Sequence, residues 1–147
     1  MNERAATSRY LFVYGLLRRA SGHVVAEGLM DGARHVGLAR AQGRLFDNGG
    51  YPGVIDSDDP ADLVIGDVFE ITEDPAFLER LDAFEACGPA DPEPHEYRRA
   101  VRSVKTAAGD MQSWIYLYNR PVDGKRRIAS GDFLADISID ARKRVMR

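Results

Sequence analysis

Residues 74–85, DPAFLERLDAFE, carry the clearest helix signal in this chain. Asp74 is a suitable N-cap, and Pro75 suits the first position of a helix because it needs no N–H donor there. Gly88-Pro89 is expected to end the helix. Four apolar side chains recur at helical spacing on one face: Phe77, Leu78, Leu81 and Phe84. The segment therefore predicts an amphipathic helix that packs against something larger.

The segments on both sides of this helix predict short strands. They are rich in β-branched and aromatic residues and are separated by turns containing Gly, Asp or Asn. Pro52 would confine its strand to a sheet edge or a bulge, and Gly66 could mark a bulge in another. One helix among many strands predicts an α+β protein with a mainly antiparallel, barrel-like β-sheet. The predicted strands are 9–14, 36–46, 51–55, 63–71, 97–106 and 111–118.

The composition is that of a globular protein of one domain. The chain has 147 residues, of which 44% are hydrophobic and 29% charged, so it can bury a core without metals or disulfides. We expect a single domain over residues 1–147, with residues 1–8 frayed. The net charge of −3 argues against a nucleic-acid binder, because such proteins normally present a basic field.

The expected location is the cytoplasm. Cys87 is the only cysteine, which excludes an intrachain disulfide and suits a reducing compartment. Residues 1–9 are polar and lack the apolar region of a signal peptide. No apolar run approaches the ~20 residues that a membrane-spanning helix needs.

Glu85 is the first candidate for chemistry. On a helical wheel at ~100° per residue, Glu85 falls between Leu78 and Leu81. Glu79 and Asp82 project away from that centre. Because a buried carboxylate must be neutralised, paired or used, three interpretations stay open. Glu85 could reach solvent at the helix end, pair with an arginine, or act as an acid/base residue.

The loop Tyr14-Gly15-Leu16-Leu17 is the second candidate. A strand that ends in Gly can expose consecutive backbone N–H groups, which bind carboxylates or developing oxyanions. An ordinary strand-to-loop turn is the alternative. Residues 15–22, GLLRRASG, lack the Gly-Lys-Ser/Thr ending of a phosphate-binding P-loop.

Other chemistries have less support. The three histidines include no i, i+4 pair, and the chain has one cysteine that could add a ligand, so we expect no metal site. Cys87 would need a base such as His95 to act as a nucleophile, and we expect a bystander thiol instead. Trp114, Tyr116 and Tyr118 alternate on one strand face and are expected to line a core or pocket wall.

A set of short motifs occurs in an order that resembles the gamma-glutamyl cyclotransferase-like family, in its small bacterial and gamma-glutamylamine branch. The first, residues 11–19 (LFVYGLLRR), is similar to the family's hydrophobic strand followed by Tyr-Gly-Thr/Ser-Leu-Arg. Residues 81–85 (LDAFE) match its Leu-Asp-x-x-Glu segment. The likeness covers residues 10–133. The remaining motifs are GRLF at 43–46, YPGV at 51–54, VIGDVFEI at 64–71, YRR at 97–99, WIYLY at 114–118 and SGDF at 130–133.

The resemblance implies a small β-barrel-like sheet flanked by helices, whose cavity holds a γ-glutamyl group. It implies that Glu85 is the catalytic carboxylate, that the backbone of Tyr14, Gly15, Leu16 and Leu17 holds the polar end of the substrate, and that Tyr97 lines the pocket. The implied reaction forms 5-oxoproline from the γ-glutamyl group and releases an amine or amino acid. It needs no metal or organic cofactor, and the partner is a small molecule rather than nucleic acid or a membrane. The chain is expected to be a monomer or homodimer.

Three departures from the family pattern bear on the substrate. Leu16 stands where the family usually has Thr or Ser, so a hydroxyl contact is lost while the backbone donors remain. Ala86 replaces a common Gly, and the stretch from Glu85 to Tyr97 is longer than in the shortest relatives. Two rival functions follow: removal of a γ-glutamyl protecting group in a biosynthetic pathway, and a non-catalytic module that binds a small molecule.

Overall fold

The computed structural model describes residues 8–15, 17–18, 28–72 and 74–137. A short helical stretch covers 133–137. The other elements, in chain order, are β1 Tyr10–Val13, β2 Arg34–Gln42, β3 Arg44–Asn48, β4 Tyr51–Ile55, β5 Leu63–Glu70, α2 Pro75–Phe84, β6 Tyr97–Thr106, β7 Gly109–Tyr118 and β8 Arg126–Arg127.

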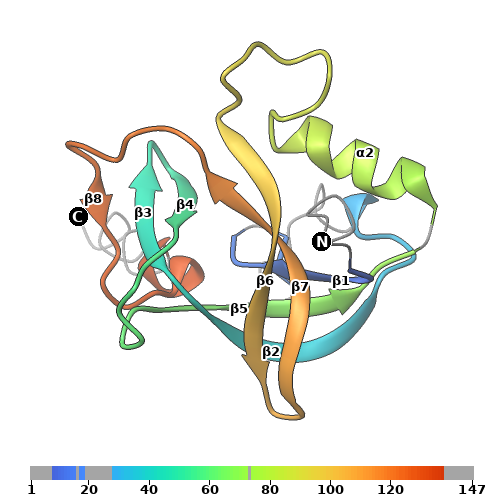
Figure 1. The fold of residues 1–147 in the computed structure, drawn as a ribbon, viewed down its shortest axis with the longest axis horizontal. Helices are drawn as coiled ribbons and strands as arrows, with labels where there is room; N and C mark the ends of the chain where they lie inside the picture. The colour runs from blue at the N-terminus through green and yellow to red at the C-terminus, as the bar shows by residue number, and fades with distance from the viewer. Residues whose placement is uncertain (1–7, 16, 19–27, 73, 138–147) are drawn as a thin grey trace, which may run out of the picture.

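Five strands close into a barrel in the order β1-β5-β2-β6-β7. Every neighbouring pair is antiparallel except β1 and β7, which close the barrel in parallel. Strands β4, β3 and β8 form a second sheet beside the barrel (Figure 1). The expected α+β class with a mainly antiparallel, barrel-like sheet is therefore confirmed. Pro52 lies in β4, an edge strand of the second sheet, as its missing N–H predicts.

Two glycines shape the sheets differently from what the sequence suggested. The predicted strand 36–46 is divided at Gly43, so β2 joins the barrel while β3 joins the second sheet. Gly66 pairs with Ala39 in regular register, and the register shift lies between His35 and Gly37. A Cβ on Gly66 would lie 2.6 Å from the ring of Phe12, so Gly66 allows close packing and does not mark a bulge.

The helix α2 begins as predicted and ends earlier. The Asp74 carboxylate accepts a hydrogen bond from the backbone N–H of Ala76 at 3.0 Å, and Pro75 is the first helical residue. The last helical residue is Phe84, four residues before Gly88. Phe84, at the end of the apolar face, is 45% exposed, whereas Phe77 and Leu81 of the same face are buried.

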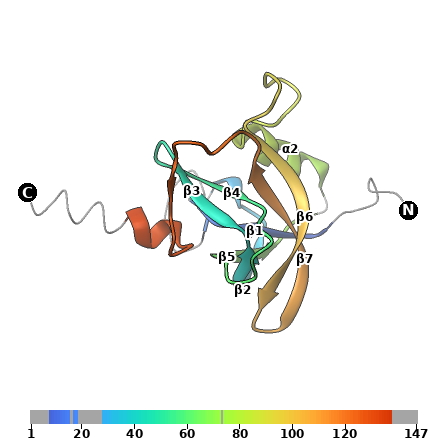
Figure 2. The same cartoon turned by 60° about the vertical axis from the view of Figure 1, so that its left-hand side comes forward.

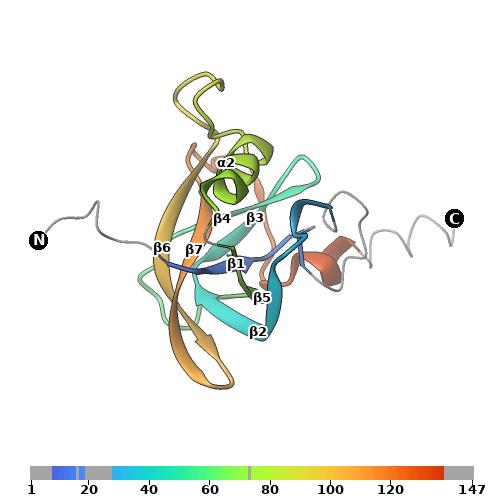
Figure 3. The ribbon, with the colours of Figure 1, turned by 90° about the vertical axis from the view of Figure 1, so that its right-hand side faces the viewer.

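The core has two parts, one inside the barrel and one between the barrel wall and α2. Phe12 and Ile115 belong to the interior part, whereas Phe77 and Leu81 of α2 pack with Tyr116 on the outer wall. Figures 1 and 3 show α2 at one side of the barrel, next to the loop that leads into β6, and Figure 2 shows the stretch 133–137 on the other side of the molecule. No helix within the described ranges is long and apolar enough to cross a membrane.

Candidate active site

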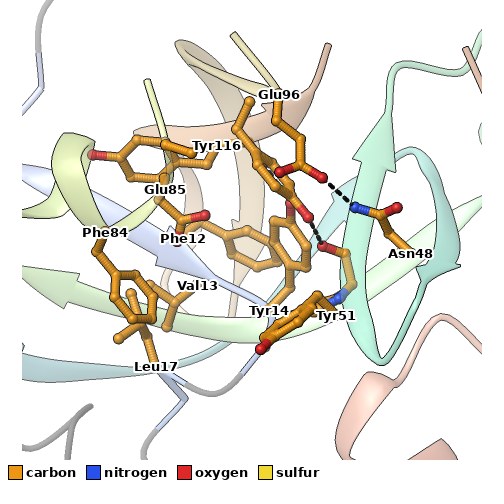
Figure 4. Close-up of a pocket in the computed structure, with 14 residues that line it drawn as sticks. Phe12, Val13, Tyr14, Leu17, Asn48, Tyr51, Phe84, Glu85, Glu96 and Tyr116 are labelled. Atoms are coloured by element: carbon orange, nitrogen blue, oxygen red, sulfur yellow. Dashed lines mark hydrogen bonds between the residues drawn. The ribbon is translucent and has the colours of Figure 1, made fainter. Parts of the chain in front are cut away.

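A cavity of about 320 Å³ opens where α2 meets the barrel and the β3–β4 hairpin (Figure 4). Most of its wall is apolar or aromatic, and two carboxylates, Glu85 and Glu96, interrupt it. The large side chains Tyr51 and Phe84 also line it, and they are 63% and 45% exposed. The complete lining is Phe12, Val13, Tyr14, Gly15, Leu17, Asn48, Tyr51, Pro52, Phe84, Glu85, Ala86, Glu96, Tyr97 and Tyr116.

Glu85 is held in place by the way α2 ends. The Cys87 N–H donates to the carbonyl of Asp82 at 2.9 Å, and the Ala86 N–H donates to that of Ala83 at 3.2 Å. These two hydrogen bonds form a Schellman motif, in which the residue after the C-cap turns left-handed. Ala86 occupies that position with φ of 58°. Glu85 is the C-cap, so the chain reverses just past it and its side chain stays in the cavity.

The carboxyl group of Glu85 is a weak acid in this setting. Desolvation by burial, followed by the nearby carboxylates of Glu96 and Asp82, raises its pKa from 4.5 to about 7. Tyr14 and Tyr97 also interact electrostatically with it across the pocket. A carboxyl with a pKa near neutrality can both take up and return a proton at physiological pH.

Asp82 points into the protein, contrary to the expectation from the helical wheel. Its carboxylate accepts two hydrogen bonds from the Arg99 guanidinium, at 2.9 and 3.2 Å, and one from the Tyr116 hydroxyl at 2.7 Å. Arg99 in turn lies over the ring of Trp114, 4.3 Å from its centroid. Asp82 therefore links the end of α2 to β6 and β7. The arginine at this end of α2 forms its ion pair with Asp82 and not with Glu85.

The two tyrosines expected in the site line the cavity. Their hydroxyl groups donate hydrogen bonds to backbone carbonyls. The Tyr97 hydroxyl donates to the carbonyl of Pro52 at 2.7 Å, and the Tyr14 hydroxyl donates to that of Tyr116. Burial raises the pKa of both hydroxyls well above the ordinary value of 10.0. Both groups therefore stay neutral and serve to fix the pocket wall.

The loop after β1 contributes Gly15 and Leu17 to the cavity wall, and Leu16 lies outside the described residues. A Cβ on Gly15 would lie 2.7 Å from Cγ of Pro52, so only glycine fits between this loop and β4. The loop is anchored by Arg18, which is 6% exposed and binds the carboxylates of Asp67 and Asp132 at 3.1 Å each.

The structure thus brings Tyr14, Gly15, Leu17, Glu85 and Tyr97 to one cavity. The sequence alone did not identify Glu96, Asn48, Tyr51 or Phe84 as pocket residues. The available signal for Glu96 was its place directly before Tyr97, at the start of a predicted strand. The others carry no local pattern that indicates a pocket.

Cys87 shows none of the features of an activated nucleophile. Desolvation and the neighbouring Asp82 raise the pKa of its thiol to about 12, whereas reactive cysteines have a lowered pKa. Its hydrogen-bond partner is Asp82, at 3.9 Å. Within the part of the chain that the structure describes, no three His, Cys, Asp or Glu side chains gather to hold a metal ion.

Comparisons with known proteins point in one direction. Residues 11–135 match the model of a family described as gamma-glutamyl cyclotransferase, AIG2-like. The gamma-glutamylcyclotransferase family protein YtfP of Escherichia coli K12 is 35% identical over 125 residues, covering 84% of this chain and 95% of that protein. The solution structure of E. coli ytfP superposes with a TM-score of 0.59 at 33% identity, over 85% of this chain and 96% of that one.

A longer protein shares the same fold. The crystal structure of YkqA from Bacillus subtilis matches with a TM-score of 0.70 at 26% identity. The match covers 92% of this chain and 43% of that protein, so this chain corresponds to less than half of YkqA.

Proposed function

This chain belongs to the gamma-glutamyl cyclotransferase, AIG2-like family, and from that premise we propose that it converts a γ-glutamyl group to 5-oxoproline with release of an amine or amino acid. One observation carries the proposal. Glu85, the acid that matches the family's Leu-Asp-x-x-Glu segment, lines an apolar-walled cavity with a pKa of about 7.

The proposed reaction takes place within one substrate molecule. The α-amine, once deprotonated, attacks the γ-carbonyl carbon, and a C–N bond forms that closes the five-membered ring. The original amide C–N bond then breaks and the leaving nitrogen takes up two protons. No water is consumed, so the enzyme has only to fold the substrate into a near-attack conformer and move protons from the attacking nitrogen to the leaving nitrogen.

Glu85 is the proposed proton carrier. The attacking nitrogen loses two protons in all, one from the α-ammonium group before the attack and one from the ring nitrogen after it. Glu85 accepts each proton as a carboxylate and returns it as an acid to the leaving nitrogen, which departs as an ammonium ion. A pKa near 7 suits both half-reactions, because the carboxyl group can then change state at neutral pH without a large free-energy cost.

The loop of Tyr14, Gly15, Leu16 and Leu17 is the proposed binding site for the polar end of the substrate. The Arg18 N–H donates to the Gly15 carbonyl at 3.0 Å, so this donor is already used within the loop. Tyr97 is proposed to form the opposite wall, since its hydroxyl is bound to Pro52 of β4.

Incubation with a panel of γ-glutamyl amines and γ-glutamyl dipeptides, with chromatographic detection of 5-oxoproline, tests this function. At least one donor should give 5-oxoproline and the released amine in equal amounts. The N-acetylated form of the same donor is the matched control, because its blocked nitrogen cannot attack and should give no product. Release of glutamate instead would indicate hydrolysis, and absence of product from the whole panel would favour the binding-module interpretation.

A further inference from the structure

Glu96 is a second acid in the cavity, and the function proposed above does not use it. Glu96 directly precedes β6 and lines the pocket on the side of the β3–β4 hairpin. Glu85 enters from the end of α2, beside Phe84 (Figure 4). The two carboxylates therefore reach one cavity from two different elements.

The Glu96 carboxylate is oriented by a neutral amide. Nδ2 of Asn48 donates a hydrogen bond to Oε2 of Glu96 at 2.7 Å. The amide oxygen of Asn48, Oδ1, accepts a hydrogen bond from Nζ of Lys125 at 2.8 Å. A 180° flip of the amide group would break both hydrogen bonds. Asn48 therefore presents a donor to Glu96 and keeps one carboxylate oxygen fixed.

No basic side chain among the described residues forms an ion pair with Glu96. The other acid close to Glu85 has a basic partner, since Asp82 forms an ion pair with Arg99 at 2.9 Å. Glu96 thus leaves a negative charge at the edge of an apolar cavity. Such a charge favours the entry of a cation, because the ion pair forms where water is partly excluded.

We propose that Glu96 binds the α-ammonium group of the γ-glutamyl substrate, and that Asn48 positions it for this role. The inference rests on the proposed function, because the ammonium group belongs to the substrate named there. With the ammonium group held by Glu96, the proposed proton acceptor Glu85 lines the same cavity. One acid then binds the nitrogen and the other removes its proton.

A pair of ligands that differ only in the α-amine tests the proposal through binding affinity rather than rate. L-Glutamine carries the amine, and glutaramic acid is the same molecule without it. Binding of each is measured by NMR titration of the wild type and of Glu96→Gln. The wild type should prefer L-glutamine by roughly tenfold or more, as expected for a charge-assisted hydrogen bond, and Glu96→Gln should show nearly equal affinities.

Glu93→Gln is the matched control, because it removes the same charge from the same segment at an exposed position. It should keep the wild-type preference. Asn48→Ala is the second variant, and it should reduce the preference several-fold while leaving the Glu96 charge in place. A wild-type preference for L-glutamine that persists in folded Glu96→Gln, an undiminished preference in Asn48→Ala, or a wild type that does not distinguish the two ligands would overturn the proposal.

Kinetics separate this inference from the proposed function. With a γ-glutamyl donor that is turned over, Glu96→Gln should raise KM by roughly tenfold and change kcat less. An unchanged KM would reject the role of Glu96 while the cyclotransferase function stands. Amine-dependent binding that requires Glu96, together with no 5-oxoproline from any donor, would reject the function and leave the ammonium site supported.

Discussion

Arg99 holds the carboxylate of Asp82 through two hydrogen bonds, from Nε at 2.9 Å and from Nη2 at 3.2 Å. The two side chains are 25% and 19% exposed. Asp82 lies three residues before Glu85, and its charge contributes to the raised pKa of the Glu85 carboxyl. This ion pair therefore joins α2 to the barrel and also sets the charge next to the proposed acid/base residue.

We expect Asp82→Asn to lower the free energy of unfolding by about 1–3 kcal/mol, because it leaves the half-buried Arg99 without its counter-ion. Asp56→Asn is the control. Asp56 accepts two hydrogen bonds from Arg102, at 3.0 and 2.8 Å, but their side chains are 50% and 39% exposed, so the loss should be about 1 kcal/mol or less. Urea denaturation measures both, and equal losses would contradict this account of burial.

Glu85→Gln should reduce 5-oxoproline release by roughly a hundredfold or more, since loss of a general base typically costs ~10²–10⁴-fold. The amide keeps the size of the side chain and removes its ability to accept the proton. Glu79→Gln is the control on the same helix, where the residue is exposed, and its activity should stay near that of the wild type. A Glu85→Gln enzyme that keeps most of its turnover would show that the proposed mechanism is wrong.

The pH dependence of kcat/KM should report the Glu85 carboxyl. Its pKa of about 7 predicts that activity falls as the pH drops below neutrality, because the protonated acid can no longer accept the substrate's proton. Rates across pH 5 to 9 with a confirmed donor measure this limb. A limb centred near the ordinary pKa of glutamate, about 4.3, would mean that Glu85 is not desolvated as the structure indicates.

The stability of the fold should also depend on Glu85. Its pKa in the folded state, about 7, exceeds the ordinary value of 4.5, so the folded protein binds a proton that the unfolded chain releases in this range. The contribution of this group to the free energy of unfolding is therefore fully present below about pH 4.5 and is lost as the pH rises through 7.

Between low and high pH, the free energy of unfolding should fall by at most roughly 3 kcal/mol for a pKa shift of this size. Glu85→Gln removes the dependence, so its advantage in free energy of unfolding over the wild type should grow from pH 4.5 to pH 8. Denaturation curves at both pH values measure the difference. An advantage that does not grow with pH would contradict the raised pKa.

Ala86→Gly should stabilise the protein by about 0.5–1 kcal/mol. Ala86 has φ of 58°, where a Cβ costs roughly 1–2 kcal/mol, and glycine avoids that cost at the expense of greater freedom in the unfolded chain. Thermal unfolding measures the gain. Ala83→Gly is the comparison, because Ala83 lies inside α2 and has no positive φ, so the same substitution there should destabilise the protein by about 0.5–1 kcal/mol. A destabilised Ala86→Gly would show that the Schellman motif does not govern this turn.

Local patterns in the sequence were enough for much of the fold. The N-cap at Asp74, the turn at Gly49-Gly50 and the strand Tyr97–Thr106 could be predicted because each depends on neighbouring residues and on a fixed period of 2 or 3.6. The family resemblance through residues 11–19 and 81–85 also needed no coordinates. The end of α2 was misplaced, because Ala86 takes a left-handed conformation that the sequence signals only when the residue is glycine.

What the tertiary structure alone decided is which acids meet and which are neutralised. Glu85, Glu96 and Asn48 lie in one cavity because the end of α2, the start of β6 and the end of β3 meet there. The helical wheel predicted that Asp82 points outward, but its carboxylate accepts a hydrogen bond from Arg99 of β6 and points into the protein. Periodicity describes the angle of a side chain about its own helix. The partner that a charge finds, and the pKa that results, depend on chain segments brought together only by folding.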